Sequence, residues 1–162
     1  MQPLAVAQLL LLLTLANGTP VVAKKVLGER LAYPLDGGMK FADGRPLFGH
    51  SKTVRGIVLS ILATAAGAPL VGLDAGIGAL IAGGAMAGDL LSSFIKRRFD
   101  LQPSSRASGL DQIPESLLPL LACRNTLSLT LWDIAAAVAL FFAGEVILSR
   151  LLYRLRLRDR PY

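Results

Sequence analysis

Residues 3–23 form an apolar stretch without a single charged side chain, and this feature constrains the fold more than any other. A membrane-spanning helix needs about 20 predominantly apolar residues to cross about 30 Å of hydrocarbon. Further apolar stretches follow at 57–73, 75–95 and 127–152, and a shorter one lies at 113–123. The sequence therefore predicts an all-α integral membrane protein with about five transmembrane helices.

Two of these stretches admit a second interpretation. The first resembles a signal peptide in length, but it has no Lys or Arg before its apolar segment, so we expect a retained helix. The fourth is short and contains Pro114 and Pro119, so a tilted or re-entrant segment is an alternative to a full span. We expect residues 1–162 to form a single membrane domain.

The composition excludes several other classes of protein. With 53% hydrophobic and 17% charged residues, the chain is too apolar for disorder and for one aqueous core of this size. The single Cys123 excludes a disulfide scaffold. The net charge of +6, combined with a mean hydropathy of +0.55, favours a basic membrane face over a nucleic-acid partner. We therefore expect no binding of nucleic acid.

The basic residues are distributed unevenly along the chain. With five spans, sixteen of the seventeen Lys and Arg fall on one side of the membrane. They lie in the loops 24–56 and 96–112, at the end of the fifth stretch and in the tail 153–162. Only Arg124 falls on the other side. By the positive-inside rule the basic side is the cytoplasm. We therefore expect a multi-pass protein of the cell membrane, with its N-terminus outside, its C-terminus in the cytoplasm and its polar loops on the cytoplasmic face.

The loop 24–56 combines glycines, prolines and cations. Its five central glycines disfavour a long helix, and successive backbone N–H groups in glycine-rich turns form concavities that bind anions. Arg45, Lys52 and Arg55 add charges that suit phosphate oxygens. A basic loop held against anionic lipid headgroups explains this composition equally well.

A carboxylate precedes a group of cations at the end of the third stretch. Asp89, either Ser92 or Ser93, and Lys96 lie at helical spacing and share one face of the expected helix. Charged residues at membrane depth are candidates for function, and a carboxylate with phosphate oxygens is the usual setting for Mg²⁺. The simpler alternative is that Asp89 pairs with a neighbouring cation and the basic residues anchor the helix at the interface.

Asp111 lies at the start of the fourth stretch and has two possible roles. It suits a second metal ligand opposite Asp89, and it equally suits the N-cap of the next helix. His50 is the only histidine, and nothing in the sequence places a nucleophile beside it, so a hydrolytic triad is not supported.

Three blocks of sequence, in this order and with apolar stretches between them, resemble the CDP-archaeol synthase family. They are DGRPLFG leading to KTVRG at 43–56, GDLLSSFIKRR at 88–98 and GLDQ at 109–112. The resemblance covers about residues 21–115 and extends more distantly to phosphatidate cytidylyltransferases. It implies a five-span cytidylyltransferase with its site on the cytoplasmic face. In such an enzyme a lipid phosphate attacks the α-phosphorus of CTP, pyrophosphate leaves, and Mg²⁺ is the cofactor.

The resemblance also implies roles for individual residues. Asp89 and Asp111 are implied to be metal ligands and, with Lys96, to form the catalytic group. The other residues are expected to bind CTP or the lipid phosphate, with Arg45 included because of its charge. They are Asp36, Asp43, Arg45, Lys52, Arg55, Ser92, Ser93 and Arg97. The sequence leaves open the nature of the lipid tails, the number of metal ions and the oligomeric state, a homo-oligomer included.

The chemistry of cytidylyl transfer suits a chain with one histidine. A phosphate monoester is already ionised at neutral pH, so positioned cations and metal ions matter more than a strong base. A CDP-alcohol phosphotransferase is disfavoured, because the aspartates expected at helical spacing after Asp43 are missing. The alternative from a different class is a small non-enzymatic membrane interaction or transport protein, although transport usually requires polar groups near the membrane midplane.

Overall fold

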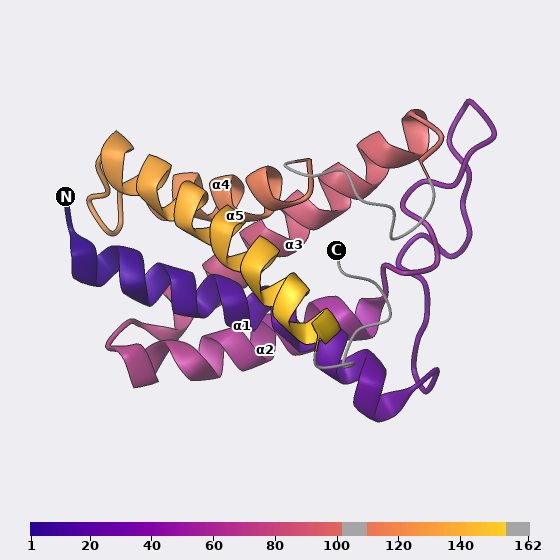
Figure 1. Ribbon diagram of the computed structural model, residues 1–162. Coiled ribbons are helices and arrows are strands. Elements are labelled where there is room, and N and C mark those ends of the chain that lie inside the picture. Colours follow the sequence, from indigo (N-terminus) through magenta and orange to yellow (C-terminus); the bar gives the residue numbers. More distant parts are fainter. Residues whose placement is uncertain (102–109, 155–162) are drawn as a thin grey trace.

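The structure, a computed structural model, describes residues 1–101 and 110–154, with the backbone alone for 149–154. The basic tail beyond 154 and the middle of the loop 96–112 therefore lie outside the described residues. The helices in chain order are α1 (Pro3–Leu27), α2 (Val54–Gly67), the short 3₁₀ helix η1 (Ala68–Val71), α3 (Ala75–Arg98), α4 (Gln112–Cys123) and α5 (Leu131–Arg154) (Figure 1). The predicted all-α fold is confirmed.

The helix boundaries follow from local capping signals. Thr53 precedes α2, and its hydroxyl accepts a hydrogen bond from Gly56 N at 3.2 Å. Asp74 caps α3 in the same way by accepting from Gly76 N at 2.7 Å. Helix α1 continues past its predicted end to Leu27, with two lysines in its last turn, where cations interact favourably with the helix dipole.

Helix α4 is much shorter than the other four main helical segments. In the described part of the chain, four segments are long and apolar enough to cross a membrane: Pro3–Leu27, Val54–Val71, Ala75–Arg98 and Leu131–Leu148. Helix α4 has 12 residues and a length of about 18 Å, against about 30 Å of hydrocarbon. All five predicted helices are present, but the fourth is too short to span a membrane by itself.

The chain nevertheless returns to the opposite end of the bundle before α5 begins. Gln2 N donates to Asp133 Oδ1 at 2.7 Å, and the Gln2 side chain donates to Ser128 O at 3.0 Å. The start of α5 therefore lies beside the start of α1. Helix α4 and the turn after it together carry the chain across the bundle.

The two ends of the bundle differ in character (Figure 1). The long loop 28–53 and the C-terminal end of α3 lie at one end, which we call the polar end, and α4 begins beside Gly88 in the half of α3 nearer to it. The N-terminus, η1 and the α4–α5 turn lie at the other end. The predicted grouping of the polar loops on one side is therefore present, and the compartment that this side faces stays a prediction.

Glycines on α3 allow its neighbours to approach closely. A Cβ atom on Gly88 would lie 2.2 Å from Pro114 O, and one on Gly84 would lie 2.7 Å from Pro119 Cα, both in α4. A Cβ atom on Gly78 would lie 2.5 Å from Thr64 O in α2. Small residues at such crossings let helix backbones pack together in a membrane, and α3 packs most extensively on α4.

The surface of the bundle is apolar outside the polar end. Large side chains such as Leu70 and Trp132 are 88% and 77% exposed, whereas the buried core is made of residues such as Leu12, Ile81 and Leu120. An aqueous domain rarely exposes so much contiguous apolar surface. The exposed leucines and valines along the helices are therefore suited to contact lipid, as expected of a multi-pass membrane protein.

Candidate active site

Two lysine–carboxylate ion pairs lie at the polar end. Lys52, just before α2, has its Nζ 2.5 Å from both carboxylate oxygens of Asp89 on α3. Lys96, also on α3, has its Nζ 2.7 Å and 3.0 Å from the two oxygens of Asp111. The four side chains are only 8–25% exposed, so their charges are weakly screened yet still reachable from solvent.

These contacts show which partners the two aspartates have when no metal ion or substrate is present. Asp89 does pair with a cation, but that cation comes from the long loop rather than from its own helix. Asp111 occupies the N-cap position of α4 without a side-chain cap hydrogen bond, and its carboxylate turns to Lys96 instead. Its buried Oδ1 is the oxygen nearest to Lys96 Nζ, at 2.7 Å.

Glu115 is a residue of this site that the sequence analysis did not select. Its side chain is 8% exposed and hydrogen-bonds with Asp89, with Lys52 and Glu145 close enough to interact electrostatically. The Glu115 carboxyl therefore lies directly beside the Lys52–Asp89 ion pair. The available signal was a charged residue inside an apolar stretch, a pattern that marks functional positions in membranes.

Ser92, Ser93 and Arg97 extend the site along α3. All three are buried, and the Ser92 hydroxyl donates to the backbone oxygen of Asp89 at 2.9 Å. Arg97 is 7% exposed, and its Nε has no hydrogen-bond partner. A buried guanidinium with an unused donor provides a place for an anionic oxygen.

Asp36 organises the long loop. It is 2% exposed and accepts hydrogen bonds from the backbone N–H groups of Gly38 at 3.0 Å, Phe48 at 3.0 Å and Gly49 at 2.9 Å. Burial would raise the pKa of Asp36, but the three N–H donors outweigh it and hold the pKa below its ordinary value of 3.8. The structure therefore places Asp36 beneath the loop, where it ties residues 36–38 to 48–49.

The lowered pKa of Asp36 predicts that acid loosens this loop. A carboxyl whose pKa is depressed by folding stabilises the folded state above the unfolded pKa, and this contribution is lost as the pH falls through the folded pKa. We expect amide hydrogen exchange in residues 36–49 to be slow at neutral pH and to accelerate, relative to intrinsic rates, below about pH 4. Asp36→Asn should exchange quickly at neutral pH as well; slow exchange in that variant would contradict the assignment.

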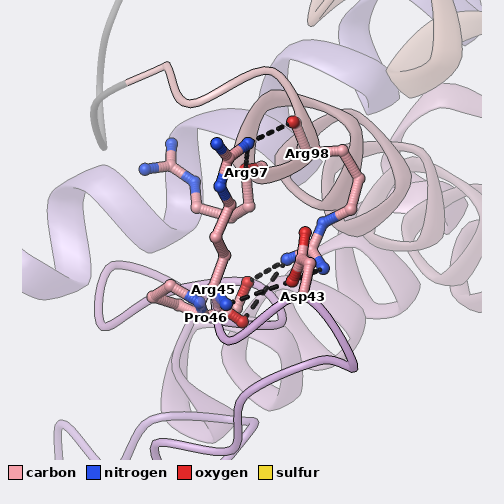
Figure 2. Close-up of polar contacts among 5 residues, drawn as sticks. All are labelled: Asp43, Arg45, Pro46, Arg97 and Arg98. Carbon is pink, nitrogen blue, oxygen red and sulfur yellow. Dashed lines mark hydrogen bonds and ion pairs between the residues drawn. The ribbon is translucent and has the colours of Figure 1, made fainter.

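Asp43 and Arg98 join the long loop to the end of α3 (Figure 2). Arg98 Nη1 donates to Asp43 Oδ1 at 2.6 Å, and Arg98 Nη2 donates to Pro46 O at 2.6 Å. The guanidinium also lies 4.8 Å from the ring centroids of both Phe41 and Phe94. Asp43 therefore pairs with Arg98, and not with Lys52 or Lys96.

Arg45 and Arg55 make further contacts with backbone oxygens. Arg45 reaches up from the loop and donates to the carbonyl oxygen of Arg98 (Figure 2). Arg55 donates to Gly28 O at 3.1 Å and to Arg30 O, which links the end of α1 to the start of α2. Both arginines therefore hold segments of the polar end together. The Nε atom of Arg55 is buried and has no hydrogen-bond partner.

The donor set at this site suits Mg²⁺ held partly by a substrate. Within the part of the chain that the structure describes, no group of three or more His, Cys, Asp and Glu is arranged to hold a metal ion. Mg²⁺ is usually bound through one or two carboxylates together with phosphate oxygens and water. Asp89 and Asp111 fit that mode of binding, because they supply hard oxygen ligands without a closed protein cage.

Comparison with known proteins reveals close relatives over almost the whole chain. Residues 71–162 match the family model described as CarS-like, CDP-archaeol synthase. The chain is 36% identical over 155 residues to the CDP-archaeol synthase of Pyrobaculum calidifontis, covering 91% of this chain and 90% of that one. It is 38% identical over 163 residues to the CDP-archaeol synthase of Hyperthermus butylicus, covering 91% and 89%.

A solved structure has the same fold. It is described as an intramembrane enzyme for archaeal membrane lipid biosynthesis, and it matches with a TM-score of 0.75 and 32% identity over 87% of this chain and 90% of that chain. The solved structure thus agrees with the membrane bundle, and the family model and the relatives agree on the family. The chain belongs to the CDP-archaeol synthase family of membrane enzymes.

Proposed function

We propose that this enzyme transfers the cytidylyl group of CTP to the phosphate of an archaeal-type ether lipid, which yields a CDP-activated lipid and pyrophosphate. The observation that carries the proposal is the meeting of two shielded lysine–carboxylate pairs, Lys52–Asp89 and Lys96–Asp111, at the polar end of a membrane bundle. The relatives' name supports it, since CDP-archaeol synthase denotes a product that joins CDP to archaeol.

The reaction requires neutralisation of charge more than proton transfer. The lipid phosphate is largely ionised at neutral pH, so one of its oxygens attacks the α-phosphorus of CTP directly. The bond from the α-phosphorus to the oxygen that bridges it to the β-phosphorus breaks, and pyrophosphate leaves with that oxygen and its charge. Lys52, Lys96 and Arg97 supply positive charge where the triphosphate and the lipid phosphate would meet.

The carboxylates act as temporary partners for these lysines. In the resting site each lysine is held in place by an aspartate. When phosphate oxygens arrive, the lysines exchange the aspartates for phosphates, and the freed carboxylates become available to Mg²⁺. Bound Mg²⁺ would be held by Asp89 and Asp111 together with phosphate oxygens, and would supply further neutralisation of the triphosphate.

The proposed orientation in the membrane follows the distribution of charge. Lys24, Lys25 and the cations of the site lie at the polar end, and positive charge marks the cytoplasmic side of membrane proteins. CTP would then reach the site from the cytoplasm, while the lipid would arrive from within the bilayer.

An acceptor panel tests the proposed function. Purified enzyme would be given labelled CTP with archaeal ether-lipid phosphate, phosphatidate or polyprenyl phosphate, with and without Mg²⁺. We expect a labelled CDP-lipid and an equal amount of pyrophosphate, formed only with Mg²⁺ and fastest with the ether-lipid phosphate. CTP with Mg²⁺ should also raise the melting temperature, and ATP should not. Absence of both transfer and CTP protection would contradict the proposal.

A further inference from the structure

Arg98, the last residue of α3, is a cation of the polar end that is not among the residues expected to bind substrate. Its Nη1 donates to Asp43 Oδ1 at 2.6 Å, and its Nη2 donates to Pro46 O at 2.6 Å (Figure 2). The guanidinium also lies 4.8 Å from the ring centroids of Phe41 and Phe94, which contact each other edge to face. One side chain therefore has two oxygen acceptors and two aromatic rings as partners.

These contacts fix the guanidinium of Arg98 better than a single surface ion pair would. An isolated exposed pair contributes little, because water screens it and both side chains lose freedom when they pair. The Arg98 side chain is only 19% exposed, and its four partners come from both the loop and the helix. A planar guanidinium can donate in two directions and lie against aromatic rings at the same time, which an ammonium group cannot do.

The part of the loop that Arg98 contacts is a hairpin, residues 39–47. Backbone hydrogen bonds of 2.8 Å and 3.0 Å join the two arms of this hairpin. Arg45, near its turn, donates to the backbone oxygen of Arg98 (Figure 2). The hairpin and the end of α3 therefore hold each other through side chains from both segments.

Short hydrogen-bonded links connect the hairpin to Lys52. Asp36 accepts a hydrogen bond from Gly49 N at 2.9 Å, two residues after the hairpin ends. Gly49 O accepts from Lys52 N at 3.2 Å, and Lys52 O accepts from Leu35 N at 2.8 Å. The position of Lys52 therefore depends on how the hairpin lies on α3.

The loop thus meets α3 at two separate points. Lys52 pairs with Asp89, and Arg98 holds the hairpin nine positions further along the helix, about 14 Å at about 1.5 Å per residue. Under the proposed function, Lys52 leaves Asp89 when phosphate oxygens arrive. The contacts of Arg98 do not involve the exchanged groups, so they can keep the loop on α3 while substrate is bound.

We propose that Arg98 is a positioning residue for CTP, which keeps the hairpin on α3 and so holds Lys52 where the triphosphate binds. The inference rests on the proposed function. Apparent affinity falls in proportion to the fraction of molecules in the arrangement that can bind, so releasing the hairpin weakens the binding of CTP. The lipid phosphate would arrive from within the bilayer, so its binding should depend much less on the hairpin.

Arg98→Ala and Arg98→Lys test the inference by steady-state kinetics. The matched control is Arg124→Ala, which removes an exposed arginine at the other end of the bundle. In both Arg98 variants we expect the KM for CTP to rise about 10-fold, equivalent to about 1.4 kcal/mol. The KM for lipid phosphate and the kcat at saturating CTP should stay within about 2-fold. Lysine should not rescue, because one ammonium cannot replace the guanidinium fork. Arg124→Ala should match the wild type.

Amide hydrogen exchange provides a second readout that does not require transfer. The amides of residues 39–47 should exchange at least about 10-fold faster in Arg98→Ala than in the wild type, and saturating CTP should slow them again. An unchanged KM for CTP would overturn the inference, and so would a fall in kcat and melting temperature with no change in that KM. Failure of the proposed function would look different, because the wild type itself would then neither transfer nor bind CTP.

Discussion

Asp89→Asn is expected to abolish cytidylyl transfer while leaving the protein folded. The amide keeps the size of the side chain but removes the charge that faces Lys52 Nζ at 2.5 Å and that would bind Mg²⁺. Loss of one well-placed electrostatic group at a reacting centre typically lowers kcat by about 100- to 1,000-fold. The rate of CDP-lipid formation from labelled CTP, at saturating lipid phosphate, measures the effect.

The matched control for this variant is Asp74→Asn. Asp74 caps α3 at the opposite end of the same helix, so its replacement removes an equal charge far from the polar end. We expect Asp74→Asn to retain nearly full activity. The two variants should melt within a few degrees of each other, which separates a catalytic effect from unfolding. Wild-type activity in Asp89→Asn would refute the metal-ligand assignment.

Gly88→Ala is expected to produce the largest loss of stability among single methyl additions on α3. The new Cβ would lie 2.2 Å from Pro114 O, and the clash is with backbone that cannot rotate away. Alanine gains about 1 kcal/mol over glycine in a helix, but overpacking costs about 1–3 kcal/mol and more in severe cases. The net effect should be a melting temperature several degrees lower in detergent.

Activity should fall together with stability in Gly88→Ala. Forcing α3 and α4 apart separates Asp89 on α3 from Glu115 on α4. It also separates Lys96 on α3 from Asp111, which immediately precedes α4. Gly83→Ala is the matched control, since a Cβ there meets no atom within 4 Å. It should be as stable as the wild type or slightly more so. Equal melting temperatures in the two variants would show that the close α3–α4 approach is not needed.

The helices could be predicted from the sequence because a membrane span needs only length and apolarity. The stretches at 57–73 and 75–95 correspond to α2 with η1 and to α3, and Asp74 between them indicated the break correctly. The short α4 was harder to interpret, because its prolines and its length were compatible with several geometries. Its packing against Gly84 and Gly88 depends on tertiary contacts that no local pattern reveals.

The candidate site could be predicted as a set of residues but not as a set of partners. Spacing on one helix grouped Asp89 with Lys96, yet the structure pairs Asp89 with Lys52, which lies 37 residues away in the chain. Asp36 was expected beside the nucleotide, and it lies under the loop with both oxygens accepting backbone hydrogen bonds. Helical periodicity carries no information about how a loop of this kind folds back onto a helix.

The shortness of α4 has a consequence for the bilayer around the enzyme. A helix about 12 Å shorter than the hydrocarbon thickness creates a hydrophobic mismatch, which the surrounding lipids relieve by thinning at a cost of fractions of a kcal/mol per ångström. We expect the annulus of lipids on the α4–α5 side to be thinner than the annulus beside α1 and α2. Lateral exchange of lipids should then be easiest on that side of the protein.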